Sequence, residues 1–180
     1  MPFYRSHKRA LTCLSSLILL ALSSCSGRAS QCNQLISTIN RSESFISDYE
    51  QSINQSLTQI SGAQSLEEIK SAANTYISAV SEASNQTNTL AQDIQDLALN
   101  DEQLSRYRNQ YASILTQSAA ALTSAQSAMQ LIADANTEAD FSNSFNTFQK
   151  QTSAAYETLQ SSDSASSATI EEINTYCAPQ

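Results

Sequence analysis

Residues 66–97 read LEEIKSAANTYISAVSEASNQTNTLAQDIQDL. In this stretch an apolar or small side chain recurs at alternating steps of three and four residues, which is the heptad pattern of a helix packed against other helices. The seam consists of Leu66, Ile69, Ala73, Tyr76, Val80, Ala83, Thr87, Leu90, Ile94 and Leu97. Because one helix cannot bury such a seam alone, other helices of similar length must face it.

Three further segments carry comparable apolar stripes. We expect helices from about Ser30 to Ser61, from a turn at 99–101 to Ala135, and from Phe141 to Cys177. The inward positions are Cys32, Leu35, Ile39, Ile46, Tyr49, Ile53, Leu57 and Ile60 in the first of these, Leu104, Tyr107, Tyr111, Ile114, Ser118, Ala121, Ala125, Ala128 and Ile132 in the next, and Phe141, Phe145, Phe148, Thr152, Ala155 and Leu159 in the last. No stretch alternates as a strand would. The sequence therefore predicts an all-α, up-down-up-down four-helix bundle, and a long helical hairpin that dimerises is the alternative.

Local signals set the helix boundaries. Gly62 is expected to end the first helix, and Ser65 with Glu68 forms a capping box for the second. Asn100 with Gln103 is expected to cap the third helix. The turn between the second and third helices is needed because Asp101 would otherwise occupy a seam position.

The last helix is the least regular. Asn136 or Thr137 is expected to cap it. Its apolar stripe is lost across the serine-rich residues 161–169. Thr169 and Glu172 have the spacing of a second capping box, so the sequence allows either a kinked helix or a helix broken before Thr169.

The first 24 residues have the features of a signal peptide. Arg5, Lys8 and Arg9 precede an apolar stretch from Ala10 to Leu22. This stretch is shorter than the roughly 20 residues of a membrane-spanning helix. We therefore expect export of the chain.

The signal ends in Leu22-Ser23-Ser24-Cys25, which resembles the lipobox of bacterial lipoproteins. The resemblance implies that Cys25 is acylated, becomes the mature N-terminus and attaches the protein to membrane lipid. Residues 25–29 are then a lipidated N-terminus and linker, and residues 30–180 form the bundle domain. Cleavage by the ordinary signal peptidase, which would give a freely secreted protein, is the alternative.

Charge and composition exclude several functions. Three of the nine basic residues lie in the signal, whereas all 17 acidic residues follow it, so the mature chain carries a formal charge of −11. Its six basic residues are scattered along the sequence, which disfavours nucleic-acid binding. The single histidine, His7, also belongs to the signal. Without histidine the usual hydrolase and two-metal bundle sites cannot form, so we expect no enzyme activity, cofactor or catalytic metal.

Two groups of side chains have residue types that occur in binding sites. An acidic group near the second turn offers oxygen ligands for calcium but lacks the spacing of a dedicated loop. It comprises Asp93, Asp96, Asn100, Asp101 and Glu102. Tyr107 and Tyr111, beside two arginines, have the spacing to frame a ligand. In both cases the ordinary interpretation is favoured, namely a solvated helix end for the acids and core packing for the tyrosines.

Cys32 and Cys177 are expected to form a disulfide. Cys13 lies in the signal and Cys25 is assigned to lipid, which leaves two cysteines in an exported domain. Both continue inward stripes at the end of the bundle that the first and last helices share. Two buried free thiols, or pairing between chains, are the alternatives.

Two short motifs resemble the ends of an uncharacterised family of small exported helical proteins and lipoproteins of cyanobacterial type. They are Cys32-Asn33-Gln34-Leu35-Ile36 with Ile39-Asn40, and Ile173-Asn174-Thr175-Tyr176-Cys177. The resemblance implies the helical fold and export, and it implies no activity.

Together these features predict a membrane-anchored lipoprotein of the bacterial cell envelope, facing the periplasm or the cell exterior. Its expected role is structural or protein-interacting, with an unknown envelope protein as partner. A small-molecule or sensory binding bundle is the alternative, although the alanine-rich third helix argues against a large internal cavity.

Overall fold

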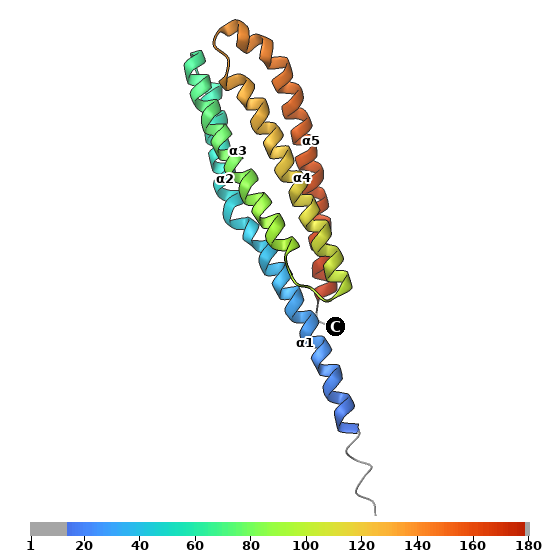
Figure 1. Ribbon diagram of the computed structural model, residues 1–180. Helices are drawn as coiled ribbons and strands as arrows, with labels where there is room; N and C mark the ends of the chain where they lie inside the picture. Colours follow the sequence, from blue (N-terminus) through green and yellow to red (C-terminus); the bar gives the residue numbers. More distant parts are fainter. Residues whose placement is uncertain (1–13, 179–180) are drawn as a thin grey trace, which may run out of the picture.

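The computed structural model describes residues 14–178 (Figure 1). These residues form helices joined by short turns, and they contain no strand. The elements are α1 (Leu14–Ile39), the 3₁₀ helix η1 (Asn40–Ser42), α2 (Glu43–Gly62), α3 (Leu66–Gln95), α4 (Glu102–Ala133) and α5 (Glu138–Cys177). Counting α1, η1 and α2 as one interrupted segment, four helical segments pack against one another. The predicted all-α class is confirmed.

The helices form an elongated bundle (Figure 1). α3 packs against both α2 and α4, and α4 packs against α5. α1 also contacts α3, α4 and α5. Figure 1 shows the first half of α1 extending beyond the ends of the other helices, near the C-terminal end of α5. Within the described part of the chain, no helix combines the length and apolar character that a membrane crossing requires.

The N-terminal segment is helical wherever it is described. The basic residues of the expected signal peptide, Arg5, Lys8 and Arg9, lie outside the described residues. Residues 14–24 belong to α1, and so do residues 25–29, which were expected to form a linker. Cys25 is therefore part of the same continuous helix as Cys32.

The α3 seam lies in the core along its whole length. Six of its ten members are buried and the other four are partly buried. The six are Ala73, Val80, Ala83, Thr87, Leu90 and Ile94. Heptad spacing therefore identified the central helix and its buried face correctly.

The predicted continuous helix from Ser30 to Ser61 is wrong, because η1 interrupts it at residues 40–42. A 3₁₀ turn has about three residues instead of 3.6, so it shifts the helical phase of the residues that follow. Part of the predicted stripe still faces the core, because Tyr49, Ile53 and Ile60 pack against buried clusters. Ser56 is buried in place of Leu57, whereas Leu57 and Ile46 are each 44% exposed.

The helices begin near the expected positions, with two corrections to their caps. Ser65 accepts a hydrogen bond from the Glu68 amide at the start of α3, but the Glu68 carboxylate accepts from the Gln64 amide at 2.7 Å and not from that of Ser65, so the predicted capping box is only half formed. Thr137 forms a complete capping box with Asp140 at the start of α5. The cap of α4 is Asp101, whose side chain accepts from the Leu104 amide, and not the predicted Asn100 with Gln103.

The fourth segment is one unbroken helix, α5, so of the two possibilities that the sequence left open, a break before Thr169 with a second capping box is not found. The Thr169 hydroxyl donates to the Ala165 carbonyl at 2.8 Å and accepts from Gln110 of α4 at 2.9 Å. Ser162 is also buried in this stretch. Small hydroxylated side chains therefore pack here in place of larger apolar ones, and bonds within the helix and to α4 satisfy the Thr169 hydroxyl.

Candidate functional site

The structure brings Cys32 of α1 and Cys177 at the end of α5 into a disulfide. The two Sγ atoms lie 2.06 Å apart and the Cα atoms 5.8 Å apart, within the separation that a disulfide can bridge. The link joins positions 145 residues apart in the sequence. We call this part of the bundle, formed by Arg28–Ile39, residues 90–115 and residues 168–177, the disulfide end.

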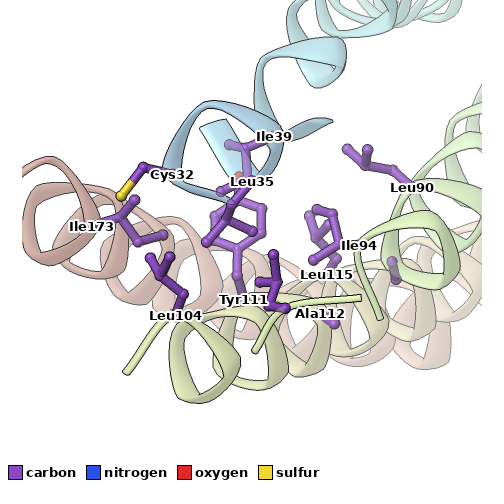
Figure 2. Close-up of a cluster of buried hydrophobic side chains, with 12 residues drawn as sticks. Cys32, Leu35, Ile39, Leu90, Ile94, Leu104, Tyr111, Ala112, Leu115 and Ile173 are labelled. Atoms are coloured by element: carbon purple, nitrogen blue, oxygen red, sulfur yellow. The ribbon is translucent and has the colours of Figure 1, made fainter. Parts of the chain in front are cut away.

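An apolar cluster fills the disulfide end (Figure 2). Its best-buried members come from four helices: Leu35 from α1, Ile94 from α3, Leu104 from α4 and Ile173 from α5, each at most 1% exposed. Figure 2 shows Cys32 beside Ile173. The covalent link and the apolar core therefore stabilise the same junction of α1 with the other helices.

A polar contact ties α1 to the loop between α3 and α4. The Gln31 side-chain oxygen accepts hydrogen bonds from the backbone amides of Asn100, at 2.6 Å, and Asp101, at 3.0 Å. These loop amides have no partner within a helix, so the glutamine satisfies donors that would otherwise need water. Gln31 directly precedes Cys32, so this contact lies next to the disulfide.

Asp101 connects the same loop to the end of α5. One carboxylate oxygen accepts from the Leu104 amide and the other accepts from the Tyr176 hydroxyl, each at 2.9 Å. Desolvation raises the pKa of Asp101, but the hydrogen bonds from Leu104, Tyr176 and Gln103, together with the positive charge of Arg28, lower it further, so that the net shift is downward. The same bond to Asp101 is the main cause of the raised pKa of Tyr176.

The Tyr176 ring contacts two other side chains. The Arg28 guanidinium is 5.4 Å from its centroid, within the range of a cation–π contact. The Tyr107 ring approaches edge-to-face, with centroids 6.1 Å apart. Tyr111 is buried in the core at 3% exposure and Tyr107 packs against the same cluster, which is the core packing that the sequence favoured for this pair. The sequence signal for Tyr176 was its place beside Cys177 in the C-terminal motif.

Two of the acidic side chains near the second turn have separate partners. Asp93 forms an exposed ion pair with Arg41 at 2.7 Å, and Asp101 caps α4. The described residues contain no group of three or more acidic, cysteine or histidine side chains placed to hold a metal ion. The ordinary interpretation, acids at helix ends, accounts for these contacts.

Cys25, the predicted lipidation site, lies in α1 seven residues before Cys32. At about 1.5 Å of rise per helical residue, the two positions are about 10 Å apart along the helix. An acyl group on Cys25 would thus attach close to the disulfide end.

Polar groups also occur in the middle of the bundle. Tyr49 and Tyr76 pack against the buried cluster of Val80, Ala83 and Leu122. Burial, with smaller contributions from Tyr76 and Glu50, raises the pKa of Tyr49 to about 12. Burial also raises the pKa of Tyr76.

Comparisons of the chain with family models, with curated proteins and with solved structures give no match. Function must therefore be inferred from the sequence motifs and from the disulfide end.

Proposed function

We propose that this protein is a lipoprotein of the bacterial cell envelope, held in the membrane through acylated Cys25, with a structural or protein-interaction role and no catalytic activity. The observation that carries the proposal is the sequence Leu22-Ser23-Ser24-Cys25 behind a basic and apolar leader. Diacylation supplies the two-chain anchoring that makes membrane attachment stable.

The arrangement of the disulfide end supports this proposal. Attachment about 10 Å from Cys32 would hold the bundle against the membrane surface. An extracytoplasmic position is also the environment in which a disulfide such as Cys32–Cys177 persists. The disulfide and the Gln31 contact would keep α1, which bears the anchor, attached to the rest of the bundle.

We further propose that the chain runs as an up-down-up-down bundle with its far end directed away from the membrane. The connections α2–α3, α3–α4 and α4–α5 are short, and consecutive helices lie against each other. The 32 residues of α4 correspond to about 48 Å of helix. Leu57 of α2 and Phe145 of α5 are 44% and 39% exposed, which leaves apolar contact area for an envelope protein partner.

Membrane fractionation of cells that express the full chain tests the anchor. We expect wild-type protein in the membrane fraction, and Cys25→Ala in the soluble extracytoplasmic fraction. Cys13→Ala is the matched control because it removes a cysteine from the leader, and it should fractionate as wild type does. A soluble wild-type protein would overturn the proposal in favour of free secretion.

A further inference from the structure

A surface cavity of about 440 Å³ lies between α4 and the last turns of α5. Tyr107, Ala168, Glu171, Glu172, Thr175 and Tyr176 line it. Its lining combines two aromatic rings with two carboxylates. By contrast, the cavity of about 560 Å³ farther along the α4–α5 groove is lined by alanine, serine, threonine and glutamine side chains, which offer neither a charge nor an aromatic face.

The two tyrosine rings form a corner. Their planes meet at 69° with the centroids 6.1 Å apart. The bond from the Tyr176 hydroxyl to Asp101 holds that ring in place. Because its position is fixed without a ligand, binding would cost little ordering of this side chain. The Arg28 guanidinium, 5.4 Å from the Tyr176 centroid, already covers part of that ring, so the Tyr107 ring is the main aromatic surface left for a ligand.

The charge at the cavity is negative. Glu171 and Glu172 are both exposed, and neither forms an ion pair within residues 14–178. The nearby arginines of α4 have other partners: Arg108 donates to the Leu97 carbonyl at 2.7 Å, and Arg106 donates to Gln103. Arg28 of α1 also lies near Tyr176, and the carboxylate of Asp101 offsets its charge. The excess charge at the cavity is therefore that of Glu171 and Glu172, which would repel an anion and attract a cation placed beside the Tyr107 ring.

We propose that this cavity binds an organic ammonium ion, either a protonated primary amine or a quaternary ammonium group. Aromatic faces favour large, weakly hydrated cations, and quaternary ammonium groups are typically recognised in this way. Two adjacent carboxylates provide too few oxygen ligands for calcium, which takes six to eight. The ammonium group can belong to a free amine or to a lipid headgroup, and in both cases the recognition chemistry is the same.

This inference does not depend on acylation of Cys25, because every residue that lines the cavity belongs to α4 or α5. A soluble protein without the anchor would retain the site. Failure of the lipidation test and failure of the ammonium test are therefore separate results.

The test compares choline with its uncharged carbon analogue, 3,3-dimethyl-1-butanol, by nuclear magnetic resonance titration of the disulfide-bonded mature chain. The two probes have nearly the same shape, so a difference in binding measures the charge. We expect saturable shifts of backbone amides around Tyr107, Glu172 and Tyr176 with choline, and binding of the analogue that is about tenfold weaker or more. No saturable shift with choline, or equal binding of both probes, would overturn the proposal.

Variants assign the effect to the lining residues. Tyr107→Phe keeps the ring and should bind choline within about twofold of wild type, whereas Tyr107→Leu should bind about three- to tenfold more weakly. The double variant Glu171→Gln/Glu172→Gln should also lose at least about threefold. Glu157→Gln removes one negative charge from an exposed site elsewhere on α5, and this variant should bind choline as wild type does. Equal weakening in this control would overturn the assignment, and circular dichroism verifies that each variant is folded.

Vesicles identify the source of the amine. The Cys25→Ala protein is mixed with phosphatidylcholine vesicles or with phosphatidylglycerol vesicles. Broadening of the same amides by phosphatidylcholine alone supports a headgroup, and shifts with free choline but not with vesicles support a soluble amine. If phosphatidylglycerol perturbs these amides as strongly as phosphatidylcholine, the cavity does not select an ammonium group and the proposal fails.

Discussion

Replacing Cys32 and Cys177 together with alanine should remove the largest single contribution to stability at the disulfide end. The link closes a loop with a sequence separation of 145, for which the chain-entropy relation gives about 5 kcal/mol at 25 °C. This figure is an upper estimate, because any residual structure in the unfolded chain reduces it. Domains are commonly stable by about 5–15 kcal/mol, so the variant should be marginally stable.

Urea unfolding followed by far-ultraviolet circular dichroism measures this loss. Wild-type protein should unfold at a much lower urea concentration in the presence of reductant, and its reduced curve should match that of the double variant. The variant itself should not respond to reductant. Cys25→Ala, which retains the disulfide, is the control and should respond as wild type does. A wild-type midpoint that is unchanged by reductant would show that the disulfide does not stabilise the folded chain.

Three further predictions concern individual side chains. Asp101→Ala removes the cap of α4 and the acceptor for Tyr176, and should cost about 1–2 kcal/mol in urea unfolding. The folded pKa of Asp101 is lowered, so its stabilisation should be present above the unfolded pKa and disappear as the pH falls through the folded value. If wild-type protein and Asp101→Ala lost the same stability on acidification, the Asp101 carboxylate would not stabilise the fold in this way. Ser56→Leu should destabilise by about 1–3 kcal/mol because the site is fully buried, whereas Leu57→Ser should cost less than Ser56→Leu. The reverse order would show that Ser56 does not face the core in place of Leu57. Tyr49 should ionise near pH 12, measured as a tyrosinate absorbance step that Tyr49→Phe removes. Because burial raises its folded pKa, its stabilisation should be full below about pH 10 and lost as the pH rises through about 12, and a step near pH 10 would contradict its burial.

The parts of the fold that could be predicted from sequence are those that local patterns determine. The α3 seam was identified because heptad spacing reports one buried face directly. The caps at Ser65 and Thr137 were identified because their side chains bond to amides within three residues. Neither inference needs information about distant parts of the chain.

The features that were missed depend on tertiary contacts. Continuity of α5 past Thr169 depends partly on the bond from Gln110, which lies 59 positions away. The contact of Gln31 with the loop at Asn100 spans 69 positions, and no local pattern indicates it. The same holds for the candidate site: the disulfide partners could be found by elimination, whereas the pairing of Tyr107 with Tyr176 required the packing of α4 against α5.

Acylation of Cys25 would anchor the protein in the membrane, and the mass of the native N-terminal peptide shows whether it occurs. The protein is purified from the membranes of its own cells, digested, and analysed by mass spectrometry without reduction. We expect a mature chain that begins at Cys25 and carries a diacylglyceryl group. An unmodified N-terminal peptide, or a chain that begins at any other residue, would contradict it.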